Sequence, residues 1–230
     1  MKRALYGFVV LFIITSVMPV HAQNAYIGVV GGANFADLDL EYVDKTITGY
    51  DIQSLTLFGV GGFFGISVNE YLSVQIEPMY LQKGGVYTRP PGPDMRIQSN
   101  QLELALLVKA GIGEKVRPYI MGGVSMSFVL DASIEVEMAG RTWVGDLTEI
   151  LKRTEYGAVF GAGISFPVWK GSTFIEGRYA LGLSNLNEGG SLNLTSGNLE
   201  LSGPQTDPRD EIKTKGWQIM VGYQLPLGAE

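Results

Sequence analysis

The sequence contains no cysteine and a single histidine, and each absence excludes a class of chemistry. Without cysteine the chain has no disulfide, no thiolate nucleophile, no Cys-ligated metal and no lipid-modified cysteine anchor. The one histidine, His21, lies in a segment that we expect to be removed. A mature chain without imidazole has no Ser-His-Asp triad, no histidine acid or base and no ordinary zinc site. Carboxylate chemistry remains open, yet no nucleophile–base pair can be nominated, so we expect a non-enzymatic protein without cofactor or metal.

Charged residues are also scarce. They make up 17% of the chain, and 17 Lys and Arg oppose 23 Asp and Glu, which gives a formal net charge of −6. The basic residues form no cluster, whereas nucleic-acid binding requires a basic patch or stripe. We therefore expect no nucleic-acid partner.

The first 22 residues have the organisation of a secretory signal peptide. Lys2 and Arg3 precede an apolar run from Ala4 to Val20, and the small residue Ala22 stands where cleavage would fall. The rival interpretation is a membrane-anchoring helix, but no basic stop-transfer cluster follows the apolar run. We therefore expect residues 1–22 to be cleaved and residues 23–230 to form one exported domain with a net charge of −8.

After the signal, no apolar run approaches the roughly 20 residues that a membrane-spanning helix needs. The chain instead contains segments in which apolar residues alternate with polar or small ones, the period of a β-strand. Each has about the length that a tilted strand needs to cross hydrocarbon, roughly 9–11 residues. The 31 glycines also suit curved, closely packed strands. The predicted strands are Ala25–Phe35, Thr56–Val68, Leu72–Lys83, Gln101–Gly111, Arg117–Leu130, Thr154–Val168, Ser172–Leu183 and Lys215–Leu227.

The connections between these segments alternate between long and short. The short ones are Asn69-Glu70, Gly113-Glu114-Lys115 and Trp169-Lys170-Gly171, and the long ones are residues 36–55, 84–100, 131–153 and 184–214. This order predicts an all-β, eight-stranded, antiparallel up-and-down barrel with both termini on the short-turn side. In bacterial outer membranes that side faces the periplasm. Within the long connections, residues 191–201 predict a hairpin and residues 146–153 predict one or two turns of helix.

The two faces of the predicted strands differ in chemistry. In Leu72–Lys83, Val74 and Ile76 lie on one side while Glu77 and Lys83 lie on the other. A water-soluble barrel such as a lipocalin would cover its exterior with charges, but here the second face carries many glycines and few charges. We therefore expect an apolar exterior facing lipid and an interior of polar and small side chains.

This arrangement predicts two sets of special residues. An ion network inside the barrel is expected to comprise Glu77, Glu103, Lys109, Glu176 and Arg178. Aromatic residues at the membrane interfaces are expected to be Tyr71, Tyr80, Phe166, Trp169 and Trp217. Pro78, which has no N–H to donate, predicts a bulge or an unpaired position near the outer end of its strand.

Five pieces of the chain, in order, resemble a known family. They are IEPMYLQKGG (76–85), LELALLVKAG (102–111), VRPYIMGGVS (116–125), YGAVFGAGISF (156–166) and GRYALGLSNL (177–186). They are similar to the outer-membrane β-barrel domain of Bacteroidetes and related bacteria, often called porin-family or PorT-like. The resemblance implies one barrel in the outer membrane of a Gram-negative bacterium and implies little about activity. Outer-membrane barrels usually end in an aromatic residue, whereas this chain ends YQLPLGAE, so either Tyr223 serves that purpose or the signal is degenerate.

These observations favour a non-enzymatic membrane barrel that acts structurally or binds at the cell surface through four long loops. A narrow pore or transporter for small solutes is the main alternative. A role as an accessory component of a secretion system rests on the family name alone. The expected partners are outer-membrane lipids and, transiently, the outer-membrane assembly machinery, while the ligand of the loops does not follow from the sequence.

Overall fold

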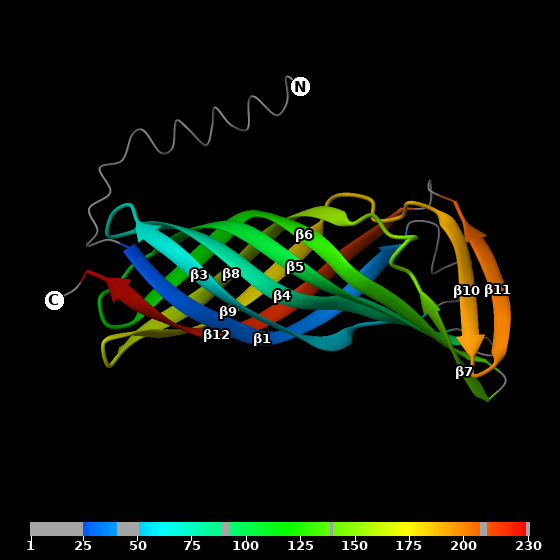
Figure 1. The fold of residues 1–230 in the computed structure, drawn as a ribbon. Coiled ribbons are helices and arrows are strands. Elements are labelled where there is room, and N and C mark those ends of the chain that lie inside the picture. The colour runs from blue at the N-terminus through cyan, green and yellow to red at the C-terminus, as the bar shows by residue number, and fades with distance from the viewer. Residues whose placement is uncertain (1–24, 41–50, 89–92, 139, 208–210, 229–230) are drawn as a thin grey trace, which may run out of the picture.

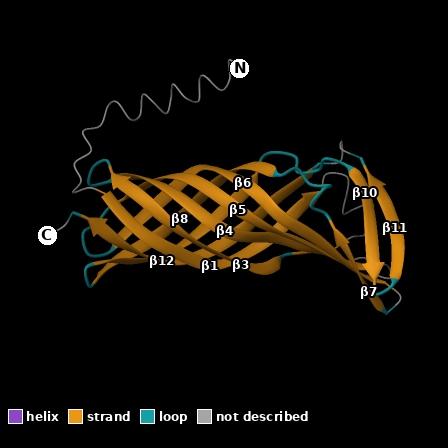
Figure 2. Ribbon diagram, viewed as in Figure 1, coloured by secondary structure: helices purple, strands orange, loops and turns teal. Residues whose placement is uncertain are grey.

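Twelve strands of one antiparallel sheet make up the regular structure of the described chain (Figures 1 and 2). The computed structural model describes residues 25–40, 51–88, 93–138, 140–207 and 211–228, so the predicted signal segment lies outside it. Nowhere in these ranges is there a helix long and apolar enough to cross a lipid bilayer. The strands are β1 (Ala25–Leu40), β2 (Asp51–Gln53), β3 (Leu55–Ser67), β4 (Leu72–Thr88), β5 (Asp94–Gly111), β6 (Arg117–Met138), β7 (Arg141–Asp146), β8 (Thr154–Val168), β9 (Gly171–Gly182), β10 (Gly190–Ser196), β11 (Leu199–Thr206) and β12 (Ile212–Leu227).

Eight of the strands close into a ring, in the order β1, β3, β4, β5, β6, β8, β9 and β12, with β12 paired to β1. The closing ladder runs from Ala25↔Leu227 to Leu40↔Ile212 without a shift in register. Closure pairs the backbone N–H and C=O groups around the ring, which hydrocarbon requires because it offers no hydrogen-bond partner. The predicted eight-stranded up-and-down barrel is confirmed, and each predicted segment overlaps one of its strands, several of which extend further at the end opposite the short turns.

The two ends of the barrel differ, as the connections predicted. Short turns, the start of β1 and the end of β12 gather at one end (Figure 1). In one of these turns the Asn69 side chain accepts hydrogen bonds from the backbone N–H groups of Tyr71 and Leu72, both at 2.8 Å. In another, Trp169 adopts φ +53°, a left-handed conformation that glycine usually supplies. At the opposite end β4, β5 and β6 continue past the ring.

The long connections are largely strands rather than loops. β7 pairs with β6, β10 with β7 and β11 with β10, and together with the ends of β5 and β6 they form an outer sheet. In Figure 1 β10 and β11 lie beyond the barrel and run across its long direction. The predicted hairpin at 191–201 is confirmed by the pair Leu194↔Leu201.

The outer sheet has a hydrophobic core of its own, separate from the barrel interior. Its buried members are Val129, Ala132, Ile134, Val136, Leu147, Ile150, Leu151, Leu186, Leu192 and Leu194. The predicted helix at 146–153 is wrong: the segment forms one turn, in which the N–H groups of Ile150 and Leu151 both donate to the Leu147 carbonyl at 3.0 Å. The apolar spacing of this segment therefore reflects packing against the sheet.

Burial confirms which face of the barrel points inward. Leu104 and Ile219 are 38% and 50% exposed on the outer surface, whereas Glu77 and Arg178 are 0% and 2% exposed. The outward-facing side of the barrel strands is therefore the apolar one.

The interior is not limited to polar and small side chains, which corrects the prediction. Large apolar residues also fill it: Tyr26, Val30, Phe63, Met79, Leu81, Phe174 and Met220 form one buried cluster. Interior glycines make room for them, because a Cβ at Gly28 would overlap the Phe63 ring and a Cβ at Gly222 would overlap the Phe174 ring. Glycines of one strand thus make room in the lumen for the large side chains of another.

Pro78 interrupts the ladder as predicted, but not at the predicted place. It pairs with Leu104 of β5, while the β3–β4 ladder has a gap between Gly61↔Met79 and Phe64↔Ile76 with no change of register. Because β4 runs on to Thr88, Pro78 lies near the middle of its strand rather than at its outer end.

Candidate functional site

The first ionic cluster inside the barrel is centred on Arg178 of β9. Its guanidinium donates from Nε to Glu176 Oε1 and from Nη2 to Glu77 Oε2, both at 3.0 Å, and further short contacts join Arg178 to each carboxylate. Glu176 is two residues away on the same inner face, whereas Glu77 belongs to β4, which lies opposite β9 in the ring. The Arg178–Glu77 pair therefore spans the lumen.

Lys109 of β5 belongs to the same cluster. Its Nζ lies 3.3 Å from Glu176 Oε2, and the hydroxyl of Tyr119 donates to that same oxygen at 2.7 Å. The ammonium also lies 5.1 Å from the ring centroids of Tyr119 and Phe174, within the range of a cation–π interaction. A carboxylate and two aromatic rings thus hold the Lys109 ammonium in place.

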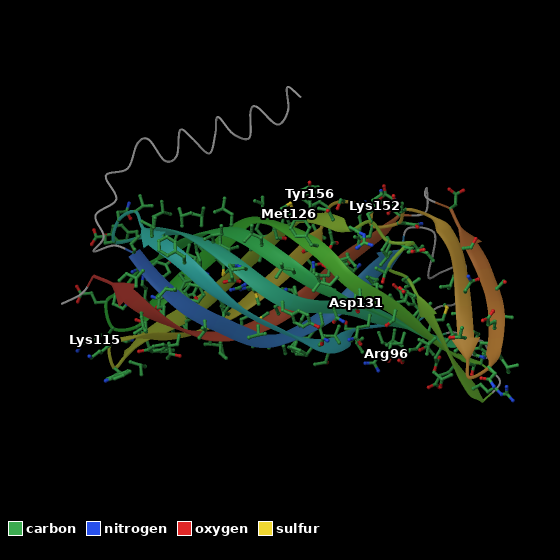
Figure 3. The ribbon with its side chains drawn as sticks, in the orientation of Figure 1. Arg96, Lys115, Met126, Asp131, Lys152 and Tyr156 are labelled. Atoms are coloured by element: carbon green, nitrogen blue, oxygen red, sulfur yellow. The ribbon has the colours of Figure 1, made fainter. Side chains whose placement is uncertain are left out.

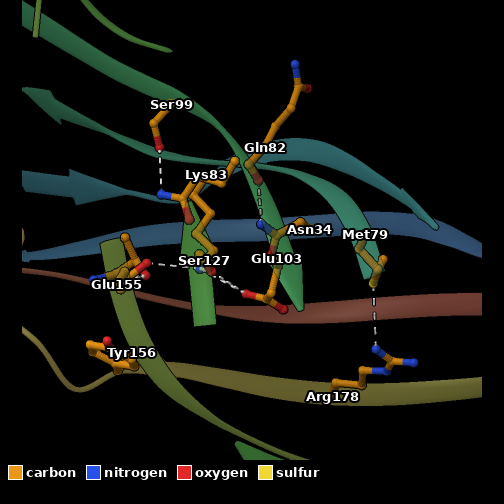
Figure 4. Close-up of polar contacts among 12 residues, drawn as sticks. Asn34, Met79, Gln82, Lys83, Ser99, Glu103, Ser127, Glu155, Tyr156 and Arg178 are labelled. Carbon is orange, nitrogen blue, oxygen red and sulfur yellow. Dashed lines mark hydrogen bonds and ion pairs between the residues drawn. The ribbon is translucent and has the colours of Figure 1, made fainter. Parts of the chain in front are cut away.

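A second cluster lies further toward the outer end, centred on Lys83 of β4. Its Nζ lies 3.1 Å from Glu103 and 3.1 Å from Glu155 (Figure 4). The Ser127 hydroxyl donates to Glu103 at 3.0 Å, and the Thr214 hydroxyl donates to Glu155 at 2.6 Å. Side chains of β4, β5, β6, β8 and β12 are joined in this way.

The predicted network is therefore divided into two. Glu77, Lys109, Glu176 and Arg178 lie together, and Glu103 lies with Lys83 and Glu155 instead. Alternation along a strand shows that a residue lies on the inner face. It does not show at which position along the barrel axis that residue meets side chains of the other strands. Lys83 and Glu155 were missed as network members, although both stand on the polar side of their predicted segments.

Apolar side chains separate the two clusters. Along the inner face of β4, Met79 and Leu81 follow Glu77 and precede Lys83, and both are buried. Arg178 Nη1 also lies 3.9 Å from the sulfur of Met79 (Figure 4). The cavity beside Lys83 and Glu155 measures about 10 Å³, close to the smallest space that holds one water. Ionic and apolar side chains together thus fill this part of the lumen.

The ion pairs and hydrogen bonds of the two clusters connect strands across the lumen. Each carboxylate of the two clusters faces Arg, Lys or a hydroxyl donor, so none is left as an isolated acid or base. Within the described ranges no group of three or more Asp, Glu, His or Cys side chains is placed to hold a metal ion.

The five predicted interface aromatics lie at two levels on the barrel exterior. Tyr71, Phe166 and Trp169 are exposed at the short-turn end, and Trp169 is 88% exposed. Tyr80 and Trp217 lie further along the barrel, where Tyr80 packs on Phe58 and Trp217 packs on Tyr179 at a centroid distance of 5.0 Å. Their contact with lipid headgroups stays a prediction.

Comparison with known proteins identifies the family. Residues 21–188, more than half of the chain, match the family described as the outer membrane protein beta-barrel domain. No curated protein matches the sequence. A major outer membrane protein from Thermus thermophilus has a similar structure (TM-score 0.50, 12% identity, covering 87% of this chain and 99% of that one). Ail, the attachment invasion locus protein of Yersinia pestis, is also similar (TM-score 0.44, 14% identity, covering 88% of this chain and 99% of that one). So is the outer membrane protease OmpT of Escherichia coli (TM-score 0.45, 11% identity, covering 92% of this chain and 99% of that one).

At such low identity these similarities concern the fold alone. The family match covers the chain from before β1 into the connection between β9 and β10, which includes seven of the eight barrel strands. The chain therefore belongs to the family of outer membrane protein β-barrel domains.

Proposed function

We propose that this protein is a non-enzymatic barrel of the Gram-negative outer membrane that binds a partner at the cell surface through its outer sheet. The observation that carries the proposal is the contrast between the two halves of the molecule. The lumen is filled by side chains, whereas the residues beyond the ring form a sheet with its own core. We propose in addition that the protein is of the PorT-like type found in Bacteroidetes and that residues 1–22 are cleaved as a signal peptide.

The filled lumen argues against the pore alternative. Eight-stranded barrels have an interior just wide enough for side chains to fill. Here the Arg178–Glu77 pair crosses the lumen, and the buried side chains of Met79 and Leu81 fill space beside it. A solute would have to displace these side chains to pass.

The outer sheet is suited to binding because it presents side chains in a fixed register. One row of paired positions crosses five strands on the face that points away from the core, and all of its members are exposed. They are Arg96, Glu135, Val144, Thr195 and Glu200. Such a surface is ordered before a partner arrives, so little ordering entropy opposes binding.

The absence of enzymatic activity is proposed on chemical grounds. The only histidine lies in the predicted signal segment, and the interior carboxylates are engaged in ion pairs. Among the described residues, the interior therefore offers no nucleophile–base pair of the kind that hydrolases use.

The experiment that tests the proposal is a planar-bilayer recording on the purified, refolded, full-length protein. We expect no steady conductance above the noise of the empty bilayer. The variant Arg178→Ser, which removes the side chain that crosses the lumen, is recorded beside it and is expected to show more frequent transient openings. A large, steady open state of the wild-type protein would contradict the proposal and favour the transporter alternative.

A further inference from the structure

The short-turn end of the barrel contains two adjoining cavities with a basic lining. The inner one measures about 80 Å³ and reaches Lys109 and Arg117, and the outer one measures about 250 Å³ and reaches Lys170. They share Tyr26, Ser67 and Gln224. None of the residues that line either cavity is an aspartate or a glutamate.

The cations that line these cavities differ in their partners. Deeper in the lumen, Lys109 and Arg178 are balanced by Glu176 and Glu77. Arg117 donates instead to the neutral backbone carbonyl of Glu70, and it makes no ion pair with a described residue. Lys170 lies against the Trp169 ring, 5.8 Å from its centroid, and likewise has no carboxylate partner within the described ranges. Arg117 and Lys170 are thus the two cations of these cavities that no described carboxylate pairs.

Neutral hydrogen-bond donors surround these cations. The lining of the inner cavity includes the hydroxyls of Ser67, Ser73 and Ser165 and the side-chain amide of Gln224. The cavity is closed on its inner side, because Arg178, Glu77 and Glu176 fill the lumen beyond Lys109. A solute that enters from the short-turn end can bind there but cannot pass through.

We propose that these cavities form a binding site for a small oxyanion group, a phosphate or a carboxylate, presented from the short-turn side. A guanidinium recognises such groups through paired, charge-assisted hydrogen bonds, and Arg117 is the lining cation with a free charge nearest the inner cavity. A cleft of one sign of charge with low-dielectric walls also raises the local concentration of anions. In the orientation proposed above, the ligand would come from the periplasm. The site is independent of the partner that the outer sheet binds.

The test is a titration of the ¹⁵N-labelled, refolded full-length protein in detergent micelles at low salt. Inorganic phosphate and acetate are added in separate arms, and the amide shifts of Ser67, Gly111 and Ser165 are followed. We expect saturable shifts there and no shift at Gly140, which lies in the outer sheet region. Saturation by phosphate alone identifies a phosphate group as the ligand, and saturation by both anions identifies any oxyanion.

Two variants of equal charge change provide the comparison. Arg117→Gln removes the lining cation and is expected to weaken binding about tenfold or more, the loss expected for one charge-assisted hydrogen bond. Lys115→Gln removes an exposed charge at the same end (Figure 3) that lines neither cavity, and it should leave the affinity unchanged. Lys170→Gln replaces Arg117→Gln if the latter fails to refold.

Three results would overturn the proposal. The first is the absence of saturable shifts with both anions. The second is an equal loss of affinity in Arg117→Gln and Lys115→Gln, which would show only the general attraction of a charged surface. The third is a shift pattern centred on the outer sheet.

Discussion

Arg178 is the centre of the ionic cluster that crosses the barrel interior. It is 2% exposed and lies between two buried carboxylates, Glu77 and Glu176, that come from opposite sides of the ring. Removing one partner of a buried ion pair leaves the other charge uncompensated in a medium of low dielectric, which costs more than the pair contributes. The cluster therefore stabilises the barrel only while it is complete.

We predict that Arg178→Met lowers the free energy of unfolding by about 3–5 kcal/mol. The measurement is a urea titration of the refolded protein in detergent micelles, followed by the difference in gel mobility between boiled and unboiled samples. The double variant R178M/E77Q also removes one of the two carboxylates that Arg178→Met leaves without a partner, so it should recover part of the lost stability. A single variant as stable as wild type would show that the cluster does not brace the lumen.

Trp169 combines an unfavourable backbone conformation with an exposed side chain. With φ +53° and 88% exposure, it gains little from packing and its backbone is strained. We predict that Trp169→Gly raises the free energy of unfolding in micelles by about 1 kcal/mol, since glycine adopts this conformation freely. In lipid vesicles the gain should shrink or reverse, because an interfacial tryptophan is lost. A change of equal size and sign in both media would contradict an interfacial role.

At the scale of the element, glycine sets how closely neighbouring strands approach. A Cβ at Gly123 of β6 would overlap the carbonyl oxygen of Leu106 on β5, whereas a Cβ at Gly177 of β9 would meet nothing within 4 Å. Both glycines lie inside barrel strands, so they form a matched pair. The close approach of the two strands therefore requires glycine at position 123 but not at position 177.

We predict that Gly123→Ala destabilises the barrel by about 2 kcal/mol, because the two strands must separate. Gly177→Ala should be neutral or stabilising by about 0.5 kcal/mol, since alanine loses less backbone entropy on folding. Urea midpoints of both variants in micelles provide the check. Equal effects of the two substitutions would mean that the close approach at Gly123 is relieved without cost.

The outer sheet should be able to lose its packing without loss of the barrel. Leu194 of β10 points into the outer core, and its neighbour Thr195 points away from it. We predict that Leu194→Asp makes the region beyond the ring sensitive to limited proteolysis, while the barrel keeps its heat-modifiable gel mobility. Thr195→Asp should leave both properties unchanged. Loss of the barrel in Leu194→Asp would show that the two cores fold as one unit.

At the scale of the whole molecule, the two ends of the barrel differ in structure. Tight turns, the start of β1 and the end of β12 occupy one end, and the outer sheet occupies the other (Figure 1). In outer-membrane barrels tight turns face the periplasm. Because the chain has no cysteine, a single introduced thiol reports the side on which it lies.

We predict that Thr195→Cys is labelled in intact cells by a maleimide that does not cross membranes. Lys115→Cys, on the short turn between β5 and β6 (Figure 3), should be labelled only after the outer membrane is permeabilised. The fraction of protein shifted in mass by the label provides the measurement. The opposite pattern would place the outer sheet in the periplasm and remove the basis for a surface role.

The positions of individual residues show how far the sequence could be read. Successive side chains of a strand point to opposite faces, so the inward direction of Glu77 and the outward direction of Leu104 follow from local alternation. The height at which Glu103 meets Lys83 depends instead on the registers of all eight strands. The pairing of Glu103 with Lys83, rather than with the Arg178 cluster, therefore does not follow from the sequence.

Local alternation, strand length and turn length were enough to establish the eight strands, their inner and outer faces and the polarity of the barrel, because each is a property of a few neighbouring residues. The pairing of interior glycines with large side chains, the division of the ion network and the core of the outer sheet required the folded chain. These features join residues far apart in sequence, such as Arg178 with Glu77 and Leu151 with Leu186. Such contacts arise only when closure of the ring brings distant strands to the same height.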